Sequence, residues 1–397
     1  MAYNQKSSQW YVAKETAYGD KAGLNNFDAD GAEVAPTSIN FVEAINPTLD
    51  ASTEMIDREV LKNSMVMAQQ VLGKETSSGS MEVEFSTATG VAGSKAVNGD
   101  LLYESAMGKR LPDVASVVGT ISSGTITIAD TSAYSVGGGV KVSGGAGAAE
   151  FGVIRTIADG TTMTIAPAPA DDHTAFEGMV SFVIASPDAA QISLAIQEYF
   201  EGASQSVYTY GGNVVSDVAL SFPVANIVKA NFSLGGAGFD VANDSNTGQT
   251  VAKRNKQCVE LDPYVAKNMT FKYGGVAYDI EGLDVKVTGT IYDTEAITTE
   301  GLTNKTNTGM SDVMASFNIE YVDTSLFDKF QAGTSGELFG TVSNANSTAL
   351  IYGPKVVLSE ASKSVDSGIY KEAVSAKFLS SGLTCDEFED AITIAFS

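Results

Sequence analysis

The chain has 397 residues, of which 18% are charged and 44% hydrophobic, with 39 glycines and 9 prolines. This length predicts two to three domains, and the composition favours a folded, turn-rich β protein over a disordered one. Acidic residues outnumber basic ones 48 to 24. Nucleic acids and anionic membranes bind proteins through Lys and Arg, so a direct DNA-binding or membrane-binding role is not expected.

Cysteine content and the N-terminal sequence bear on the compartment. Cys258 and Cys385 are too few for a disulfide framework in so long a chain. The opening residues lack an apolar segment behind basic residues, so we expect no secretory signal. No window approaches the roughly 18 consecutive apolar residues of a membrane helix. We expect the chain to fold in a reducing cytosol.

Residues 1–36 are predicted to form an N-terminal arm that packs on another part or frays. The first clear strand follows at Gly79-Ser-Met-Glu-Val-Glu-Phe-Ser86, where apolar and acidic residues alternate. Its apolar residues share one face, and Glu82 and Glu84 share the other. A short helix is predicted at 100–108, with Asp100 as its N-cap and Gly108 as its end.

Residues 114–186 differ in sequence pattern from the segments on either side. Short β runs at 125–128, 140–142, 151–157, 163–165 and 180–184 are separated by glycine-rich turns. This spacing is typical of a small, self-contained β-barrel. We interpret the segment as a domain inserted into the first of two larger units.

The first unit therefore comprises 37–113 and 187–239, a polar linker spans 240–257, and the second unit runs over 258–397. The strand at 79–86 recurs in altered form as Met314-Ala-Ser-Phe-Asn-Ile-Glu-Tyr321, and a second short helix follows at 325–333. Later in each unit, 374–379 aligns with 228–233, which pairs Phe378 with Phe232. The predicted fold is mainly β, with two tandem barrel or sandwich units, each with a short flanking helix.

The sequence offers little for catalysis or metal binding. His173 has no evident nucleophilic partner, and we expect it to lie in a surface loop. With Cys258 and Cys385 far apart, no zinc site is expected, and both cysteines are interpreted as apolar fillers. The acidic stretches at 28–31 and 240–246 lack the ligand spacing of a calcium loop, and 144–147 lacks a phosphate-binding motif. We predict no catalytic, cofactor or metal site and no enzymatic activity.

Charges placed on predicted strands are the remaining signal. Glu82, Glu84 and Glu320 lie opposite apolar faces, and Asp284 and Lys286 do the same on another strand. One interpretation is a solvated sheet face. The other is that these residues line a channel, in which symmetry multiplies a modest charge into a strongly negative wall.

Taken together, these features resemble the major tail tube proteins of long-tailed, siphovirus-type bacteriophages. The resemblance rests on Lys14-Glu-Thr-Ala-Tyr-Gly19, the passage at 73–84, the helix at 101–108, the strand and turn at 230–236 and the closing run of short strands. It covers most of the chain except 114–186, so the chain would carry a duplicated tube domain with an inserted β domain.

The resemblance implies a structural virion protein whose subunits form rings that stack into the tail tube, a conduit for DNA ejection. Rings of that family contain six barrel units, so two units per chain imply a ring of three chains, with six as the alternative. The implied partners are further copies of the chain, the tape measure, tail terminator and distal tail proteins, and DNA that passes without specific binding. Assembly would take place in the cytoplasm of the bacterial host, and the inserted domain would decorate the exterior of the tube.

Two other classes of function are open at this point. A β-rich phage fibre or adhesin would bind glycans or cells without forming tubes. A carbohydrate hydrolase would need a pair of carboxylates in a cleft, which sequence alone does not identify.

Overall fold

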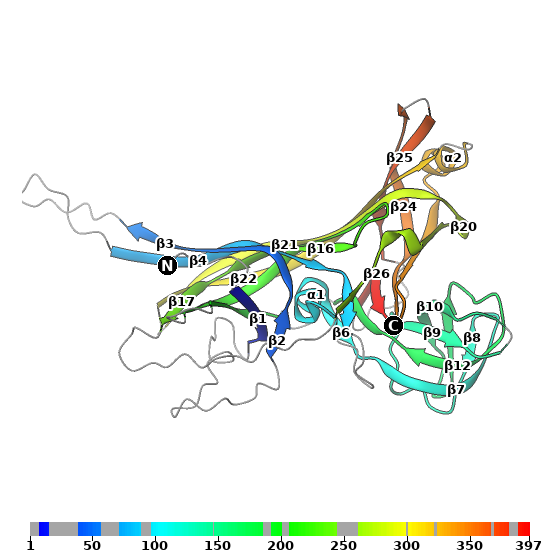
Figure 1. Cartoon of the computed structure of the whole chain (residues 1–397), viewed down its shortest axis with the longest axis horizontal. Coiled ribbons are helices and arrows are strands. Elements are labelled where there is room, and N and C mark those ends of the chain that lie inside the picture. The colour runs from blue at the N-terminus through cyan, green and yellow to red at the C-terminus, as the bar shows by residue number, and fades with distance from the viewer. Residues whose placement is uncertain are drawn as a thin grey trace, which may run out of the picture.

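The computed structural model describes residues 8–15, 39–56, 71–88, 97–145, 147–185, 192–200, 206–243, 261–298, 301–320, 324–366, 369–380 and 388–397. The fold is mainly β, as predicted, and its main feature is an antiparallel sheet that extends across the upper part of Figure 1. The order of its eight strands is β3 (Ala44–Ile56), β4 (Val71–Glu84), β16 (Lys229–Gly236), β15 (Ser206–Pro223), β21 (Ile280–Thr298), β22 (Gly301–Glu320), β25 (Ile369–Phe378) and β24 (Thr348–Asp366).

Alternating side chains give this sheet one apolar and one polar face. Met81 and Val83 of β4 are fully buried, as are Ala230 and Phe232 of β16. The intervening residues point to the opposite side, because successive side chains of a strand alternate between faces. The same alternation places the buried residues of β21, β22 and β25 on one continuous apolar face.

A second layer covers the apolar face. It contains helix α1 (Asp100–Met107), which lies directly beneath the sheet in Figure 1, and two groups of strands. One group is β2 (Ile39–Val42), β1 (Ser8–Lys14), β14 (Leu194–Phe200) and β17 (Gly238–Asn243), joined to the first part of β15. The other is β6 (Gly108–Leu111), β13 (Val180–Ala185), β26 (Phe388–Phe396), β23 (Ser335–Ser343), β19 (Met269–Tyr273) and β20 (Val276–Ala277), with the first part of β24.

Aromatic rings fill the space between the layers. Tyr103 of α1 contacts the ring of Phe232 at a centroid distance of 4.9 Å and that of Phe182 at 5.2 Å. The ring centroid of Phe85 lies 4.6 Å from that of Phe396 in the last strand. These rings are buried, and offset or edge-on pairs add about 0.5–1.5 kcal/mol each beyond the area that they bury. The beginning and the end of the chain thus share one core.

The two halves of the chain repeat the same pairings. In the first half β1 pairs with β2 and β14, β14 pairs with β15, and β15 pairs with β16 and β17. In the second half β19 pairs with β20 and β23, β23 pairs with β24, and β24 pairs with β25 and β26. Helix α2 (Ser325–Ala332) is the next element after β22, and α1 comes after β4 with only the short strand β5 (Ser86–Ala88) between them. Both helices end at a glycine in the left-handed conformation, Gly108 or Gly333.

Two details of the sequence prediction need correction. Phe232 lies opposite Met81, and Val374 lies opposite Phe317, which is the counterpart of Met81. Val374 is therefore the counterpart of Phe232, four residues before the predicted Phe378, because the pairing register and not local similarity sets the alignment. The N-cap of α1 is Gly99 instead of Asp100, which is the first helical residue.

The inserted segment forms a closed six-stranded barrel, at the lower right in Figure 1. Its strands are β7 (Val114–Ser122), β8 (Thr125–Thr127), β9 (Gly139–Ser143), β10 (Glu150–Ile157), β11 (Thr162–Ala166) and β12 (His173–Gly178). The predicted run at 180–184 does not belong to the barrel. It forms strand β13, which pairs with β6 and β26 in the second layer. The barrel rests on that layer at Gly139, whose amide donates a 2.8 Å hydrogen bond to Ser181 Oγ. A side chain at Gly139 would collide with Ala395 of β26.

Several predicted boundaries fall inside elements of the fold. Strand β1 belongs to the predicted arm, yet Val12 and Ala13 are fully buried in the second layer. Strand β17 extends to Asn243, four residues into the predicted linker. Cys258, Cys385 and the acidic stretch at 28–31 lie outside the described residues. Strands β5 (Ser86–Ala88) and β18 (Leu261–Pro263) pair with each other and connect the two halves.

Candidate functional site

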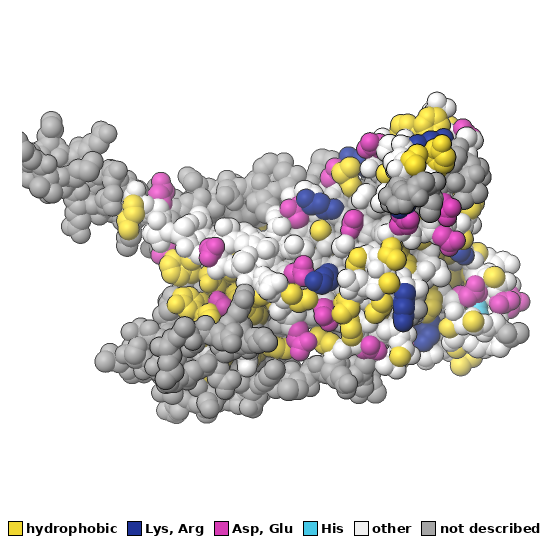
Figure 2. Space-filling model, turned by 45° about the horizontal axis from the view of Figure 1, so that its top comes forward, with side chains coloured by type: hydrophobic (Ala, Val, Ile, Leu, Met, Phe, Trp, Pro, Cys, Tyr) yellow, Lys and Arg dark blue, Asp and Glu magenta, His cyan; other side chains and the backbone are white. Residues whose placement is uncertain are grey.

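The polar face of the eight-stranded sheet is the largest feature that the core does not use. Figure 2 brings the upper side of the sheet forward and shows acidic and basic side chains dispersed among hydrophobic side chains and white groups, which are the backbone and the remaining side chains. The acidic residues on this face are Asp50, Glu82, Glu84, Asp217, Asp284, Asp312, Glu320 and Glu360, and the basic residues are Lys229, Lys286, Lys371 and Lys377.

All five residues that the sequence singled out lie on this one face. Glu82 and Lys286 belong to one row across the strands, because Glu82 pairs with Asn231, Asn231 with Ala219, and Ala219 with Lys286. Asp284 and Glu84 belong to the next row, where Ser221 and Lys229 lie between them. Glu320 lies on β22, opposite Lys371.

The lysines of the face are held mostly by acidic neighbours. Lys229 Nζ lies 2.8 Å from Glu82 Oε1, and Lys377 Nζ lies 2.9 Å from Asp312 Oδ1. Lys371 Nζ lies 2.9 Å from Glu281 Oε2. Surface ion pairs of this kind contribute about 0–1 kcal/mol each to stability. Their larger effect is electrostatic, because each pair cancels a positive charge. Among the described residues, the carboxylates of the face that remain without an ion pair outnumber the one such lysine, Lys286, and set the sign of the face.

The sequence analysis did not single out these three lysines. Lys229 lies in Lys-Ala-Asn-Phe-Ser, and Lys377 lies in a similar alternating run of β25. In both strands the alternation with buried residues places the lysines on the polar side. The signal was therefore present in the sequence. What the sequence did not show is which acidic residue, distant along the chain, would lie beside each lysine.

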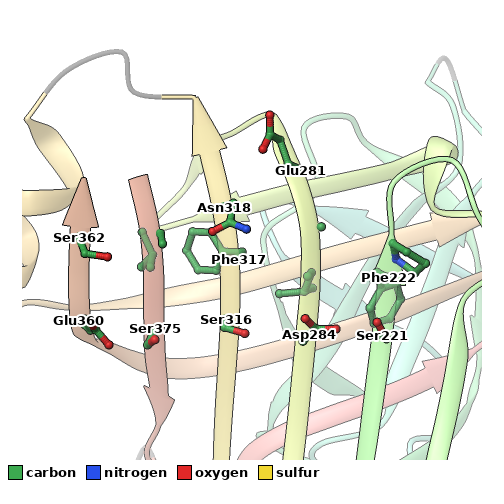
Figure 3. A pocket seen from close by; sticks show the side chains of 15 residues that line it. Ser221, Phe222, Glu281, Asp284, Ser316, Phe317, Asn318, Glu360, Ser362 and Ser375 are labelled. Carbon is green, nitrogen blue, oxygen red and sulfur yellow. The ribbon is translucent and has the colours of Figure 1, made fainter. Parts of the chain in front are cut away.

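A depression of about 280 Å³ lies on the polar face, where β21 bulges at Glu281 and Gly282. Figure 3 shows one row of its lining, in which Glu360, Ser375, Ser316, Asp284 and Ser221 follow one another across five strands. The lining offers hydroxyl and carboxylate groups but no imidazole or thiol. Within the described part of the chain, no group of three or more His, Cys, Asp and Glu side chains is placed to hold a metal ion.

The single histidine is not in a surface loop, contrary to the sequence expectation. His173 begins strand β12 and is 2% exposed. Its Nδ1 lies 3.0 Å from the Gly144 carbonyl oxygen, and its Nε2 lies 2.9 Å from Glu150 Oε2. Glu150 also accepts hydrogen bonds from the amides of Ala170 and Asp171. The imidazole therefore ties together turns at one end of the barrel.

Among the described helices, none has both the length and the apolar character needed to cross a bilayer.

Comparison with known proteins agrees with this architecture. A search of curated protein sequences finds no significant match. The model of one protein family, described as "Phage tail tube protein", matches residues 6–378. This match covers nearly the whole chain, including the barrel and both halves of the large sheet, and the family is one of structural proteins of the virion. The chain belongs to the phage tail tube protein family.

Proposed function

We propose that this protein self-assembles into rings that stack into the tail tube, and that the polar face of the eight-stranded sheet lines the bore. The observation that carries the proposal is the sheet itself. It is wide, charged on one face and covered by a second layer on the other. Its two edge strands, β3 along 44–52 and β24 along 358–366, pair with a described strand on their inner side only, so their outer edges are bare among the described residues. Bare edges of this kind promote pairing between chains.

We further propose that the chain holds two tube units, 37–113 with 187–239 and 258–397, joined through 240–257. Each unit contributes four strands to the large sheet, and the repeated pairings of the two halves support this division. Three chains with eight strands each would close a barrel of twenty-four strands. At a strand spacing of about 4.8 Å and a tilt of about 40°, its backbone radius is roughly 24 Å. A ring of six chains would give twice as many strands and a far wider bore.

The charges of the polar face suit a conduit for DNA. Duplex DNA carries one negative charge per roughly 1.7 Å, and proteins grip it by neutralising phosphates with Lys and Arg. On this face, Lys229, Lys371 and Lys377 already bind carboxylates. Glu84, Asp284, Glu320 and Glu360 form no ion pair with another described residue. Such a wall repels phosphates, so DNA passes during ejection without adhering.

The inserted barrel would decorate the outside of the tube. It contacts the second layer at Gly139 and Ser181, on the side away from the polar face. It therefore does not enter the bore. The partners of the tube would be the tape measure protein inside it and the terminator and distal tail proteins at its two ends. Assembly would occur in the cytoplasm of the host.

Electron microscopy of the purified protein tests this function. We expect stacked rings, and averaged end-on views should show threefold symmetry with three external densities from the inserted barrels. Sixfold symmetry with six external densities would support the alternative of six chains. A protein that stays monomeric at high concentration, with other tail components present, would contradict tube formation. Glycan or cell binding by that monomer would then favour a fibre or adhesin.

A further inference from the structure

The internal junction between the two halves provides a template for the junction between chains. Strand β15 ends the first half of the sheet and β21 begins the second, and they pair from Asp217 opposite Thr288 to Pro223 opposite Gly282. When the two halves of the sheet are matched strand by strand, β24 is the counterpart of β15, and β3 is the counterpart of β21. The two edge strands of the sheet, β24 and β3, thus correspond to the two strands that already pair within the chain.

A shared β-bulge fixes the alignment of β24 with β15. Ser216 is the residue left unpaired between Val215 and Asp217, where β15 meets β16. Ser359 is left unpaired in the same way, where β24 meets β25. The sequences around the bulges agree at both ends, where Ser216-Asp217 matches Ser359-Glu360 and Ser221 matches Ser364. Bulges terminate or redirect pairing at defined positions, so they are reliable markers of register.

The alignment of β3 with β21 follows from their shared neighbour. Asp284 pairs with Ser316 of β22, and Thr48 pairs with Ser80, the counterpart of Ser316 in β4. Both strands carry a bulge just before this point, at 281–282 in β21 and at 46–47 in β3. Beyond the bulge, Lys286 corresponds to Asp50.

Exposure of side chains shows that β24 lacks the cover that β15 has. Leu220 and Phe222 of β15 are 1% and 2% exposed. Their counterparts on β24 are Lys363, which is exposed, and Val365, which is 60% exposed. A large apolar side chain left open beside a bare strand edge indicates a surface that another strand and its underlying layer cover.

We propose that β24 of one chain pairs with β3 of the next copy in the register of the β15–β21 junction. Ser362 then lies directly opposite Asp50 of the next chain, as Ala219 lies opposite Lys286 within the chain. Glu360 lies opposite Ser52, and Ser364 opposite Thr48. The contact is head-to-tail, so it does not stop at a dimer, and it closes a ring of three when successive chains are related by one third of a turn. This inference rests on the ring assembly proposed above and specifies its contact residue by residue.

Disulfide trapping tests the register. Directly opposed residues in an antiparallel pair have Cα atoms about 4.5–5.5 Å apart, within the range of a disulfide. In a background with Cys258→Ser and Cys385→Ser, the variant carrying Ser362→Cys and Asp50→Cys should form disulfides between chains on oxidation. Non-reducing electrophoresis should show linked dimers and trimers and no longer ladder, because the third bond closes the ring.

Two matched variants complete the experiment. Ala219→Cys with Lys286→Cys should form its disulfide within one chain. Ser364→Cys with Asp50→Cys, shifted by two residues on the same face, should link chains at least tenfold more slowly than the matched pair. If rings are seen by microscopy and the shifted pair links faster than the matched pair, the register is wrong and the ring stands. If no ring is seen and neither pair links chains, the proposed function itself fails. A ladder that continues beyond the trimer overturns the closed ring of three.

Discussion

Lys229 lies directly across from Glu84 in the pairing of β16 with β4, yet its ammonium group binds Glu82, 2.8 Å away. The carboxylate of Glu84 is thereby left without an ion pair among the described residues, on the face proposed to line the bore. Its counterpart Glu320 lies opposite Lys371, which binds Glu281 instead. In both halves of the sheet, the lysine nearest to the repeated glutamate is bound to another carboxylate.

Reversing the charge of these two glutamates should make the bore retain DNA. For the double variant Glu84→Lys and Glu320→Lys, we expect tubes of normal appearance, because both side chains lie opposite the core. Binding of duplex DNA to assembled tubes should increase and should weaken steeply with salt, since it arises from phosphate neutralisation. Filter binding at several salt concentrations measures this.

The control for charge alone is Asp171→Lys with Asp172→Lys on the inserted barrel, where both residues are exposed. This variant changes the net charge equally but alters only the proposed exterior. Equal DNA retention by both variants would argue against a bore lined by Glu84 and Glu320.

Phe232→Ala should destabilise the fold by about 3–5 kcal/mol, because it removes a fully buried ring and leaves a cavity beside Tyr103. Asn231→Ala, next to it on the exposed face, should change stability by no more than about 0.5 kcal/mol. Urea denaturation of the unassembled protein measures both. Similar losses for both variants would contradict the division of β16 into a core face and a polar face.

Glu198 should make the stability of the second layer depend on pH. Partial burial on β14, between Trp10 and Tyr208, raises the pKa of Glu198 from 4.5 to about 7. Because folding favours the protonated form, its contribution is fully present below about pH 4.5 and is lost as the pH rises through 7. The glutamine of the Glu198→Gln variant stays neutral at both pH values. The stability of the variant minus that of the native protein should therefore be larger at pH 8 than at pH 5. Melting temperatures at both values measure the difference, and an equal difference at both would contradict the raised pKa.

Glu150→Ala should loosen the end of the inserted barrel. Partial burial acts to raise the pKa of Glu150, but hydrogen bonds from Ala170, His173 and Asp171 outweigh it and lower the pKa below its usual value. The carboxylate therefore contributes stability above pH 4.5 that is lost as the pH falls through the lowered pKa. Removing it leaves the buried His173 without one of its two partners, at a cost of about 1–3 kcal/mol.

Hydrogen exchange of the barrel amides measures the effect of Glu150→Ala, and Glu177→Ala is its control. The Glu177 carboxylate lies 3.8 Å from Lys141 Nζ in a partly exposed pair, so its loss should have little effect. Rapid exchange confined to the barrel is expected for Glu150→Ala. Unchanged protection would show that the Glu150 hydrogen bonds are dispensable.

Local pattern predicted much of the fold. Alternation in 79–86 was enough to place Glu82 and Glu84 opposite the core, and Gly108 ends α1 as expected because a glycine adopts the left-handed conformation without strain. Partners distant in sequence were not predictable in this way. His173 is buried because Glu150 and Gly144, more than twenty residues away, satisfy both ring nitrogens. The register of β25 was misjudged because similarity of short alternating strands does not distinguish shifts by even numbers of residues.

The proposed duplication of the sheet within one polypeptide has a kinetic consequence. If three chains form a ring, half of its six junctions are β15–β21 contacts that form as each chain folds, with no dependence on concentration. The remaining three must form by collision. A tube built from unduplicated subunits would need six such encounters for each ring. Covalent linkage therefore lowers the concentration at which rings nucleate, and it frees the two junctions to diverge, because only one of them has to recognise a separate molecule.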